Sequence, residues 1–216
     1  LSKLESTIYD AESAKRDLEY TRKILESTRR LLPMMTLSAS NSEQDTNTLP
    51  GHRVSQIFIS DTSATPNEHL RHCINSVRRH FQSSLYTLYD DEAIKRFLAE
   101  HYDTEVLIAY NNLKPYAYKA DLARLCILSV LGGWYIDVGV TWISSLHIPK
   151  NISLFTIRDR NHFCGTSWAC NNAIIFAEKD HPALKEGIKI ILDNCENNYF
   201  EKTSLCPTGP NAWGRA

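Results

Sequence analysis

One stretch of sequence decides the fold: residues 118–141, YKADLARLCILSVLGGWYIDVGVT. Up to about Leu131 its apolar residues recur at helical spacing and cover a broad face, which predicts a buried helix. Gly132 and Gly133 follow, and glycine readily takes the positive φ at which a helix commonly ends. Residues 134–140 then alternate as a strand does. The stretch therefore predicts a helix that leads at once into a strand.

Charged residues in this apolar stretch are unusual. Asp137 lies on one face of the predicted strand, and an ionised carboxylate in a core is costly unless it is paired or faces a ligand. Asp121 and Arg124 lie one helical turn apart on the preceding helix, so both can reach the same end of a cleft as Asp137. Two interpretations stand side by side. One is a purely structural ion pair of Arg124 with Asp121 or Asp137, and the other is a ligand site.

The same residues resemble the signature of a known family. The run KADLARLCILSVLGGWYID is similar to SDxxRxxxLxxxGGxYxDxD, the pattern of DXD-type glycosyltransferases with a nucleotide-sugar-binding fold of the GT-A type. That family includes yeast-type α-1,6-mannosyltransferases, the catalytic domains of clostridial glucosylating toxins, and bacterial capsule and lipopolysaccharide sugar transferases. The signature is long and its spacing fits, so the resemblance implies an enzyme that uses a nucleotide-sugar donor.

The resemblance implies a role for each matching residue. Asp121 and Arg124 would hold hydroxyl groups of the donor sugar and its phosphate side, and Tyr135 would pack near the nucleotide. Asp137 would be the first acid of the DXD motif, which meets the ribose, the sugar and the metal shell. Gly139 stands where the family usually has the second acid, the one that binds the divalent ion most directly.

The cofactor implied by the resemblance is Mn²⁺ or Mg²⁺, both of which suit hard oxygen ligands. Because Gly139 carries no ligand, Asp137 is the one metal ligand that we expect from the motif. Three explanations stay open: another residue supplies the second ligand, Asp137 and the donor diphosphate hold the ion together, or the protein is degenerate. Some capsule-type relatives also keep only the first acid. The presence of Asp121, Arg124 and Asp137 together favours catalysis.

The rest of the chain predicts an α/β domain. Short apolar runs predict strands at 54–60, 85–88, 152–157 and 171–176. Amphipathic segments predict helices at 66–81, 91–102 and 182–192, and 106–109 is a further short element. Alternation of strands and helices indicates a mostly parallel sheet flanked by helices. The predicted fold class is therefore α/β, with a single nucleotide-sugar-binding domain of GT-A type and an N-terminal helix.

The family resemblance adds further candidate positions. VSQIFIS at 54–60 looks like the family's opening IPKIIHQIWIG, so Phe58 or Ile59 would line the nucleotide base. NNAIIFAEKDHPAL is similar to a family strand followed by xHPxL, and its Asn172 amide would reach the donor sugar or the acceptor. PTGPNAW at 207–213 resembles the segment TGPxxxT, which precedes the last part of the family's active site. Without the family, VSQIFIS is simply a core strand and Asn172 is a turn asparagine that caps a strand.

The N-terminal part differs in character from the rest. Residues 1–33 predict an amphipathic helix, 34–51 a polar linker, and 52–216 the catalytic domain, which we expect to be incomplete at its C-terminus. Leucine or alanine recurs every seven residues, as in a coiled coil, but threonine at most second seam positions weakens such a seam. Self-association through residues 1–32 is one interpretation. A helix that lies on the domain itself is the other, and it is slightly favoured.

Composition narrows the class of protein. The 216 residues are 43% hydrophobic and 23% charged with a net charge of -1, which is typical of a globular domain and gives no reason to expect a nucleic-acid partner. No apolar run is long enough to cross a membrane. The six cysteines form no CxxC pair and have no zinc-site spacing. The cysteines are therefore expected to be reduced thiols, which favours a cytoplasmic location. That location includes the periphery of the inner face of a membrane.

These observations lead to one expected function and two alternatives. We expect transfer of a hexose from a nucleotide diphosphate sugar to a hydroxyl of a glycan or glycolipid, with retention at the anomeric carbon. No carboxylate pair at nucleophile spacing can be picked out. Catalysis would be electrostatic, with Arg124 and any metal on the leaving diphosphate, and with Asp121 and Asp137 on the sugar. The alternatives are an effector toxin that glycosylates host proteins and a catalytically silent nucleotide-sugar-binding module, which Gly139 motivates.

Overall fold

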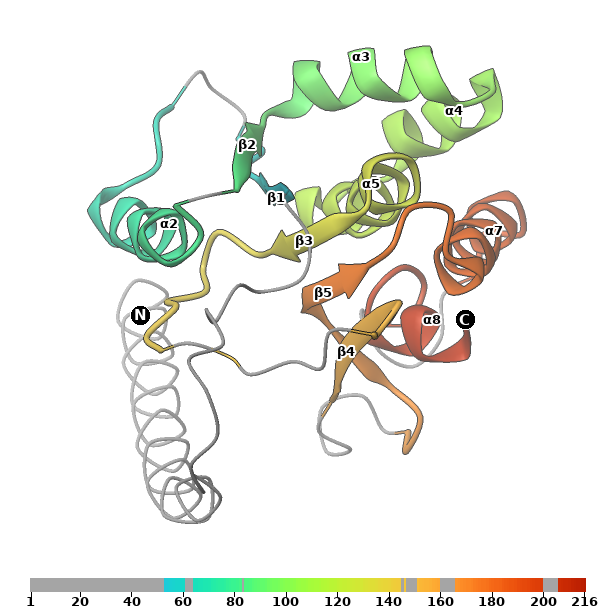
Figure 1. The fold of residues 1–216 in the computed structure, drawn as a ribbon. Coiled ribbons are helices and arrows are strands. Elements are labelled where there is room, and N and C mark those ends of the chain that lie inside the picture. Colours follow the sequence, from blue (N-terminus) through green and yellow to red (C-terminus); the bar gives the residue numbers. More distant parts are fainter. Residues whose placement is uncertain are drawn as a thin grey trace, which may run out of the picture. The chain divides into compact units, whose positions relative to one another are not determined.

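A five-stranded sheet in the order β2-β1-β3-β5-β4 forms the centre of the computed structural model (Figure 1). β1 (Arg53–Ile57) pairs in parallel with β2 (Leu85–Tyr89) and with β3 (Gly133–Ile136). β5 (Cys170–Ala177) pairs in antiparallel fashion with β3 and with β4 (Leu154–Arg158). The predicted α/β class is confirmed. Among the described strands β2, β1, β3 and β4 run in the same direction, and β5, which lies between β3 and β4, runs the other way.

The structure describes residues 53–60, 64–82, 84–144, 146, 151–159, 166–199 and 206–216. All of them fall within one compact unit. The helix predicted over residues 1–33 and the linker predicted over 34–51 lie outside these described residues. Within the described ranges, no helix is both long enough and apolar enough to cross a membrane.

Six helices accompany the strands among the described residues: α2 (Glu68–His80), α3 (Asp91–His101), α4 (Thr104–Asn112), α5 (Tyr116–Leu131), α7 (Pro182–Glu196) and α8 (Pro210–Arg215). Local side chains define their first turns. Asn67 accepts a hydrogen bond from the backbone N–H of Leu70 at the start of α2, and Asp90 caps α3 in the same way. The short element predicted at 106–109 is the middle of α4.

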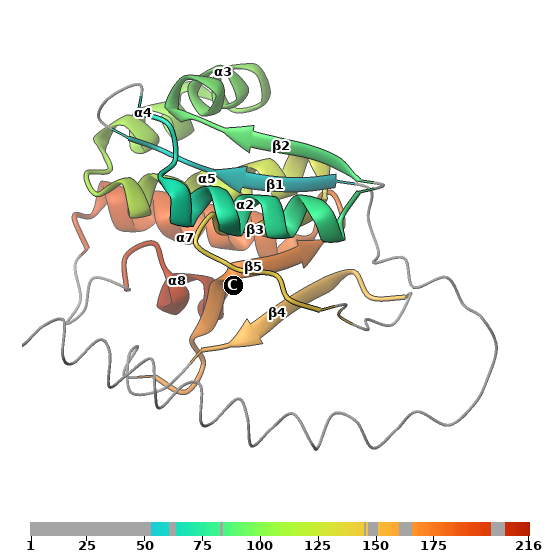
Figure 2. The ribbon, with the colours of Figure 1, turned by 90° about the vertical axis from the view of Figure 1, so that its left-hand side faces the viewer.

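The helices cover both faces of the sheet (Figures 1 and 2). On one face, Val77 of α2 belongs to a cluster that includes Trp134 of β3 and Phe176 of β5. On the other face, α3, α4, α5, α7 and α8 enclose the larger core, to which Tyr135 and Ile175 contribute. Neighbouring residues of β3 and of β5 therefore enter different cores, as the alternation of side chains along a strand requires.

α5 is the most enclosed helix of the domain. Residues 121–129 of α5 are all buried, including the predicted inner residues Leu122, Leu125 and Cys126. Burial extends around the helix because α3, α4, α7 and the sheet all pack against it. Asp121 and Arg124 are consequently held inside the protein by a helix that cannot shift without disturbing the core.

Two glycines connect α5 to β3, as predicted. Gly132 has a φ of 64° and Gly133 a φ of 95°, conformations that residues with side chains rarely adopt. Space is also restricted, because a Cβ on Gly133 would lie 2.6 Å from the carbonyl oxygen of Arg53. A Cβ on Gly132 would lie 2.8 Å from the backbone nitrogen of Lys179. The pair thus lets the chain turn tightly between β1 and the end of β5.

The strand predicted over 134–140 proved too long, because β3 ends at Ile136. The carbonyl oxygen of Asp137 accepts hydrogen bonds from the side chain of Gln56 and from the backbone N–H of Val140. These two donors take the place of a ladder partner on β1, so the chain turns at Asp137 and leaves the sheet. The first strand is also shorter than the predicted range 54–60, since β1 ends at Ile57.

Candidate active site

Asp137 lies directly beyond the C-terminal end of β3, next to the parallel strands. Ligands of open α/β sheets commonly bind at this edge. Gln56 of β1 donates from Nε2 to the carbonyl oxygen of Asp137 at 3.2 Å, and the N–H of Asp137 donates to the carbonyl oxygen of Ala173 at 2.8 Å. Two neighbouring strands therefore hold the main chain of Asp137 in place.

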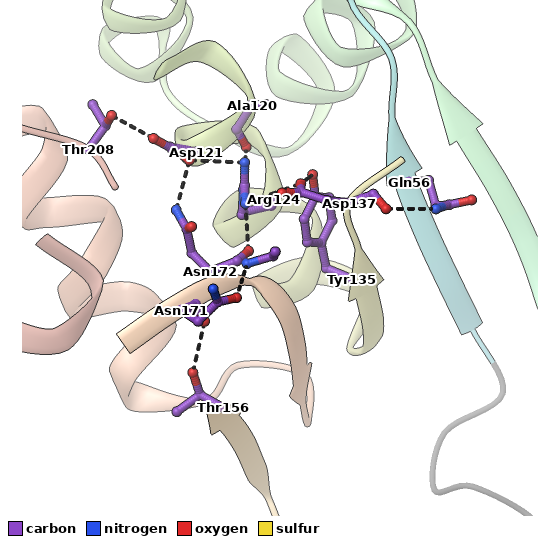
Figure 3. A network of polar contacts seen from close by, with 11 residues as sticks. Gln56, Ala120, Asp121, Arg124, Tyr135, Asp137, Thr156, Asn171, Asn172 and Thr208 are labelled. Atoms are coloured by element: carbon purple, nitrogen blue, oxygen red, sulfur yellow. Dashed lines mark hydrogen bonds and ion pairs between the residues drawn. The ribbon is translucent and has the colours of Figure 1, made fainter. Parts of the chain in front are cut away.

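Asp121 and Arg124 approach Asp137 from α5, as Figure 3 shows. Nη2 of Arg124 lies 2.9 Å from Oδ1 of Asp121, and Nη1 lies 3.3 Å from Oδ1 of Asp137. α5 leads into β3 through a tight turn, so its early residues lie near the strand's carboxyl end. The three charged residues that the sequence singled out thus come together in one cluster.

The guanidinium of Arg124 is fully engaged inside the protein. Arg124 is 4% exposed, and it donates to the carbonyl oxygens of Ala120 and Asn172. The guanidinium carbon also lies 4.6 Å from the ring centroid of Tyr135, at the distance of a cation–π contact. Burial disfavours the charge, but Asp137, Tyr135 and Asp121 outweigh this and raise the pKa of Arg124. Arg124 stays charged and orients both carboxylates. The ion pair of Arg124 with Asp121 or Asp137, one of the two interpretations of the sequence, is therefore present.

Tyr135 supports Asp137 from below. Its hydroxyl donates to Oδ1 of Asp137, and its ring is buried beneath the guanidinium of Arg124. Burial raises the pKa of Tyr135 well above its usual value, so the hydroxyl keeps its proton and remains a donor. Tyr135 was expected to pack near a nucleotide. Within the protein Tyr135 contacts Arg124 and Asp137, and Asp137 is the carboxylate that would meet such a nucleotide.

Asp121 is buried and has a partner on each oxygen. Oδ1 accepts from Nδ2 of Asn172 at 2.8 Å, and Oδ2 accepts from Oγ1 of Thr208 at 2.8 Å. Burial raises the pKa of Asp121, while Arg124 and the hydrogen bond from Thr208 oppose the rise. Sequence reasoning gave Thr208 no role. The one sequence feature that could have indicated a role for Thr208 is its position in the TGP segment, which resembles the family.

Asp137 is the part of the cluster that meets solvent. Its side chain is 37% exposed, and the contacts from Arg124 and Tyr135 both use Oδ1. Among the described residues Oδ2 of Asp137 makes no hydrogen bond or ion pair. The turn beside it is open as well, because a Cβ on Gly139 would meet nothing within 4 Å. One carboxylate oxygen and an open turn therefore face the approach to the cluster.

Metal binding by protein side chains alone does not fit this site. No group of three or more His, Cys, Asp or Glu residues suited to an ion occurs in the described part of the chain. Asp121 already has partners on both oxygens, which leaves Oδ2 of Asp137. Mg²⁺ commonly uses one or two carboxylates and completes its shell with water and substrate phosphate oxygens. The residues present fit an ion of this kind, shared with a diphosphate.

The other predicted positions lie around the cluster. Asn172 contacts both Asp121 and Arg124, so the structure brings it into the network (Figure 3). Phe58 and Ile59 follow the end of β1, and both are half-buried. The N–H of Phe58 donates to the carbonyl oxygen of Tyr89 at 2.9 Å, while Ile59 packs against the larger core. These two residues thus lie just beyond the strand whose Gln56 holds Asp137.

Comparisons with known proteins agree on one class. The profile of the family described as "Glycosyltransferase sugar-binding region containing DXD motif" matches residues 67–163, which include the whole cluster on α5 and β3. An uncharacterized glycosyltransferase, L373, of Acanthamoeba polyphaga mimivirus is 26% identical over 131 residues, 61% of this chain and 51% of the relative. The chain thus spans about half the length of this curated relative. The predicted resemblance to DXD-type glycosyltransferases is confirmed, and these matches support a transferase.

A solved structure supports the fold. The PaToxG glycosyltransferase is similar with a TM-score of 0.56 at 17% identity, and the similarity covers 77% of this chain and 67% of that one. At this level of identity the likeness concerns the fold alone, and it agrees with the α/β class predicted from the sequence.

Proposed function

We propose that this protein transfers a hexose from a nucleotide diphosphate sugar to a hydroxyl group of a glycan or glycolipid. The observation that carries the proposal is the cluster of Asp121, Arg124 and Asp137 at the carboxyl end of β3, inside the region that the DXD family profile matches. Retention at the anomeric carbon is proposed from the family resemblance. The nucleotide base would lie beside Phe58 and Ile59, beyond the end of β1.

Asp137 is the group that we expect to touch the donor. Its side chain is partly exposed, and Tyr135 and Arg124 fix its orientation through Oδ1. A carboxylate held in this way can accept hydrogen bonds from ribose or sugar hydroxyls without first losing rotational freedom. Arg124 and Asp121, being buried, are positioning residues in this proposal, and the Asn172 amide extends the same network toward the donor or the acceptor.

The charge of the cluster favours a role for a divalent ion. With both carboxylates ionised, Asp121, Arg124 and Asp137 together carry one net negative charge, which by itself repels a diphosphate. A cation shared between Oδ2 of Asp137 and the diphosphate would remove this conflict. When bound, Mn²⁺ or Mg²⁺ would stabilise the negative charge that develops on the leaving diphosphate. The protein's own part is to hold Asp137 and to keep Arg124 charged beneath it.

The test replaces Asp137 by asparagine, which keeps the shape of the side chain and removes its charge. The control is Asp180→Asn, because Asp180 is exposed, pairs with Lys185 and has a φ of 63° that asparagine tolerates. We expect Asp137→Asn to lower donor hydrolysis and sugar transfer by about 100-fold or more, in the range seen when one preorganised polar group of an active site is removed. Both variants should unfold within about 4 °C of the wild-type protein. Normal turnover by Asp137→Asn would refute the assignment.

A competing function is nucleotide-sugar binding without transfer, which Gly139 favours because it supplies no second carboxylate. Thermal unfolding with a panel of nucleotide sugars, each with and without Mn²⁺, identifies the donor first. Calorimetry and a hydrolysis assay with that donor then separate the two functions. Tight binding without hydrolysis or transfer would establish the binding module, and Mn²⁺-dependent hydrolysis would exclude it.

A further inference from the structure

We infer that Trp168 forms a platform for a sugar ring of the acceptor, next to the proposed catalytic cluster. This inference rests on the proposed function and extends it, because it places the acceptor at Trp168, just before β5 begins, and assigns it to the glycans. Three properties of Trp168 carry it: its exposure, the rigid backbone that presents it, and its place at the edge of the sheet where β3 ends.

Trp168 differs from the other tryptophans of the chain. The sequence contains four, and Trp134, Trp142 and Trp213 are 0%, 8% and 4% exposed, whereas Trp168 is 54% exposed. Single exposed apolar residues are common on protein surfaces, so exposure by itself would carry little weight. An indole is nevertheless the largest apolar surface that a side chain can offer, and it adds an N–H donor at one edge.

The backbone beneath Trp168 is clamped. Ala169 is buried, and its carbonyl oxygen accepts from the N–H of Asp159 at 2.9 Å. Gly214 of α8 lies so close that a Cβ there would collide with the carbonyl oxygen of Trp168 and would lie 2.9 Å from the Cα of Ala169. A side chain held on a fixed main chain loses little freedom when it binds, which makes an exposed aromatic ring an effective contact.

The position of Trp168 connects it to the cluster. β5 is antiparallel to β3, with Ile174 opposite Ile136, so β5 begins at the edge where β3 ends (Figure 1). From Trp168 the chain reaches Asn172 in four residues, about 13 Å at the rise of an extended strand. Asn172 in turn contacts Asp121 and Arg124. A short saccharide resting on Trp168 is therefore within reach of a donor held at Asp137.

The size and chemistry of the surface suit a sugar ring. Sugars carry apolar C–H faces and polar rims, and a flat indole beside polar groups complements both. Among the described residues of β4, β5 and their connection, the large exposed apolar side chains are Trp168 and Ile157. A protein partner would need a much broader face, since specific protein interfaces bury about 800 Å² on each side. Among the described residues the apolar patch is far smaller than such a face, and Arg158 and Asn171 beside it are polar.

The experiment compares Trp168→Ala and Trp168→Tyr with Leu85→Ala. Leu85 is also a large exposed apolar residue, but it starts β2 at the opposite edge of the sheet. The full chain is incubated with labelled nucleotide sugars over an array of immobilised oligosaccharides, and release of free sugar is measured in parallel. We expect the ratio of glycan transfer to donor hydrolysis to fall at least tenfold in Trp168→Ala, to recover largely in Trp168→Tyr, and to stay unchanged in Leu85→Ala.

Each other outcome is decisive. An unchanged ratio in Trp168→Ala, or an equal loss of hydrolysis and transfer, overturns the platform, because the second result would reveal a merely structural role. Transfer to added proteins but not to glycans overturns the assigned acceptor class while leaving the proposed function in place. If the wild-type protein neither hydrolyses nor transfers any donor, the proposed function fails, and this inference fails with it.

Fluorescence quenching gives a second, direct readout. Because the other tryptophans are buried, acrylamide should quench mainly the emission of Trp168. Addition of the oligosaccharide that the array identifies as the best acceptor, together with the nucleoside diphosphate of the donor, should protect this emission. The protected component should be absent from Trp168→Tyr. Quenching that the oligosaccharide leaves unchanged would overturn the platform.

Discussion

Arg124→Met removes the positive charge that Asp121 and Asp137 share while keeping much of the apolar volume of the side chain. The side chains of Arg124 and Asp121 are 5% and 9% exposed, so the variant leaves Asp121 as a buried carboxylate without its cation. Breaking a buried ion pair by removing one partner costs about 3–5 kcal/mol. Asp137 is 37% exposed, and its lost pairing adds at most about 1 kcal/mol after solvent screening.

We therefore expect Arg124→Met to lower the free energy of unfolding by about 4 kcal/mol at pH 7. For a chain of this size, that corresponds to a fall of about 8–16 °C in Tm. The deficit should depend on pH. Burial already raises the pKa of Asp121, and loss of Arg124 removes the nearest opposing charge, so the folded variant has a still higher pKa.

The sign of the pH effect follows from this shift. A carboxyl group whose pKa is higher in the folded than in the unfolded state stabilises the fold at low pH, and this contribution is lost as the pH rises through the folded pKa. The deficit of Arg124→Met should thus shrink once the pH falls below the pKa of Asp121 in the folded variant, by up to about 1.4 kcal/mol per pH unit between pH 7 and 5, because the folded variant then holds a proton that the wild-type protein does not.

Urea unfolding at pH 7 and pH 5 measures the loss of unfolding free energy in Arg124→Met and its dependence on pH. The matched variants are Asp121→Asn and the double variant Arg124→Met with Asp121→Asn, in which the buried group is neutral at every pH. The double variant should be more stable than Arg124→Met at pH 7 and should show little of its pH dependence. A deficit below about 1 kcal/mol at pH 7, or one of equal size at both pH values, would refute the account of a buried, coupled cluster.

Two further predictions concern the residues around Asp121 and Asp137. Thr208→Val removes the hydrogen bond that lowers the pKa of Asp121, so the acid limb of the kcat profile should move to higher pH, whereas Thr208→Ser should leave it in place. An unmoved limb in the valine variant would show that protonation of Asp121 does not limit turnover. Gly139→Asp restores the second acid of the motif where a Cβ meets nothing within 4 Å, so Mn²⁺ should bind at least tenfold more tightly in calorimetry with a nucleoside diphosphate present. The unfolding free energy should change by no more than about 0.5 kcal/mol, as for an ordinary surface substitution, and equal Mn²⁺ affinity in Gly139→Asp and the uncharged control Gly139→Asn would contradict an ion beside Asp137.

Local patterns were reliable where neighbouring residues act on each other. The helical spacing of α5, the glycine exit at Gly132 and Gly133, and the strand that follows were all anticipated, because backbone conformation and side-chain direction depend on residues a few positions apart. The one-turn spacing of Asp121 and Arg124 likewise placed both on a common side of the helix. Their meeting with Asp137 followed from the short connection between helix and strand.

The same patterns failed where a long-range partner decides the outcome. Val138 and Val140 continue the alternation of β3, yet the strand ends at Ile136 because Gln56, 81 residues before Asp137, supplies a donor to its carbonyl oxygen. The direction of β5 was equally hidden, since an apolar run such as Ile174 to Phe176 fits either direction. Strand direction depends on how the chain returns to the sheet, and no short pattern encodes it.

The sequence by itself determined the α/β class, the central helix and strand, and the identity of three charged residues. Only the tertiary structure decided which partners each of these residues has and which of them is exposed to solvent. Thr208 binds Asp121 across 87 residues of chain, Arg124 is buried between two carboxylates, and Asp137 alone opens to solvent. The physical reason is that spacing along the chain sets which side chains can face one another, whereas burial sets which of them can meet a ligand, and burial is a property of the whole fold.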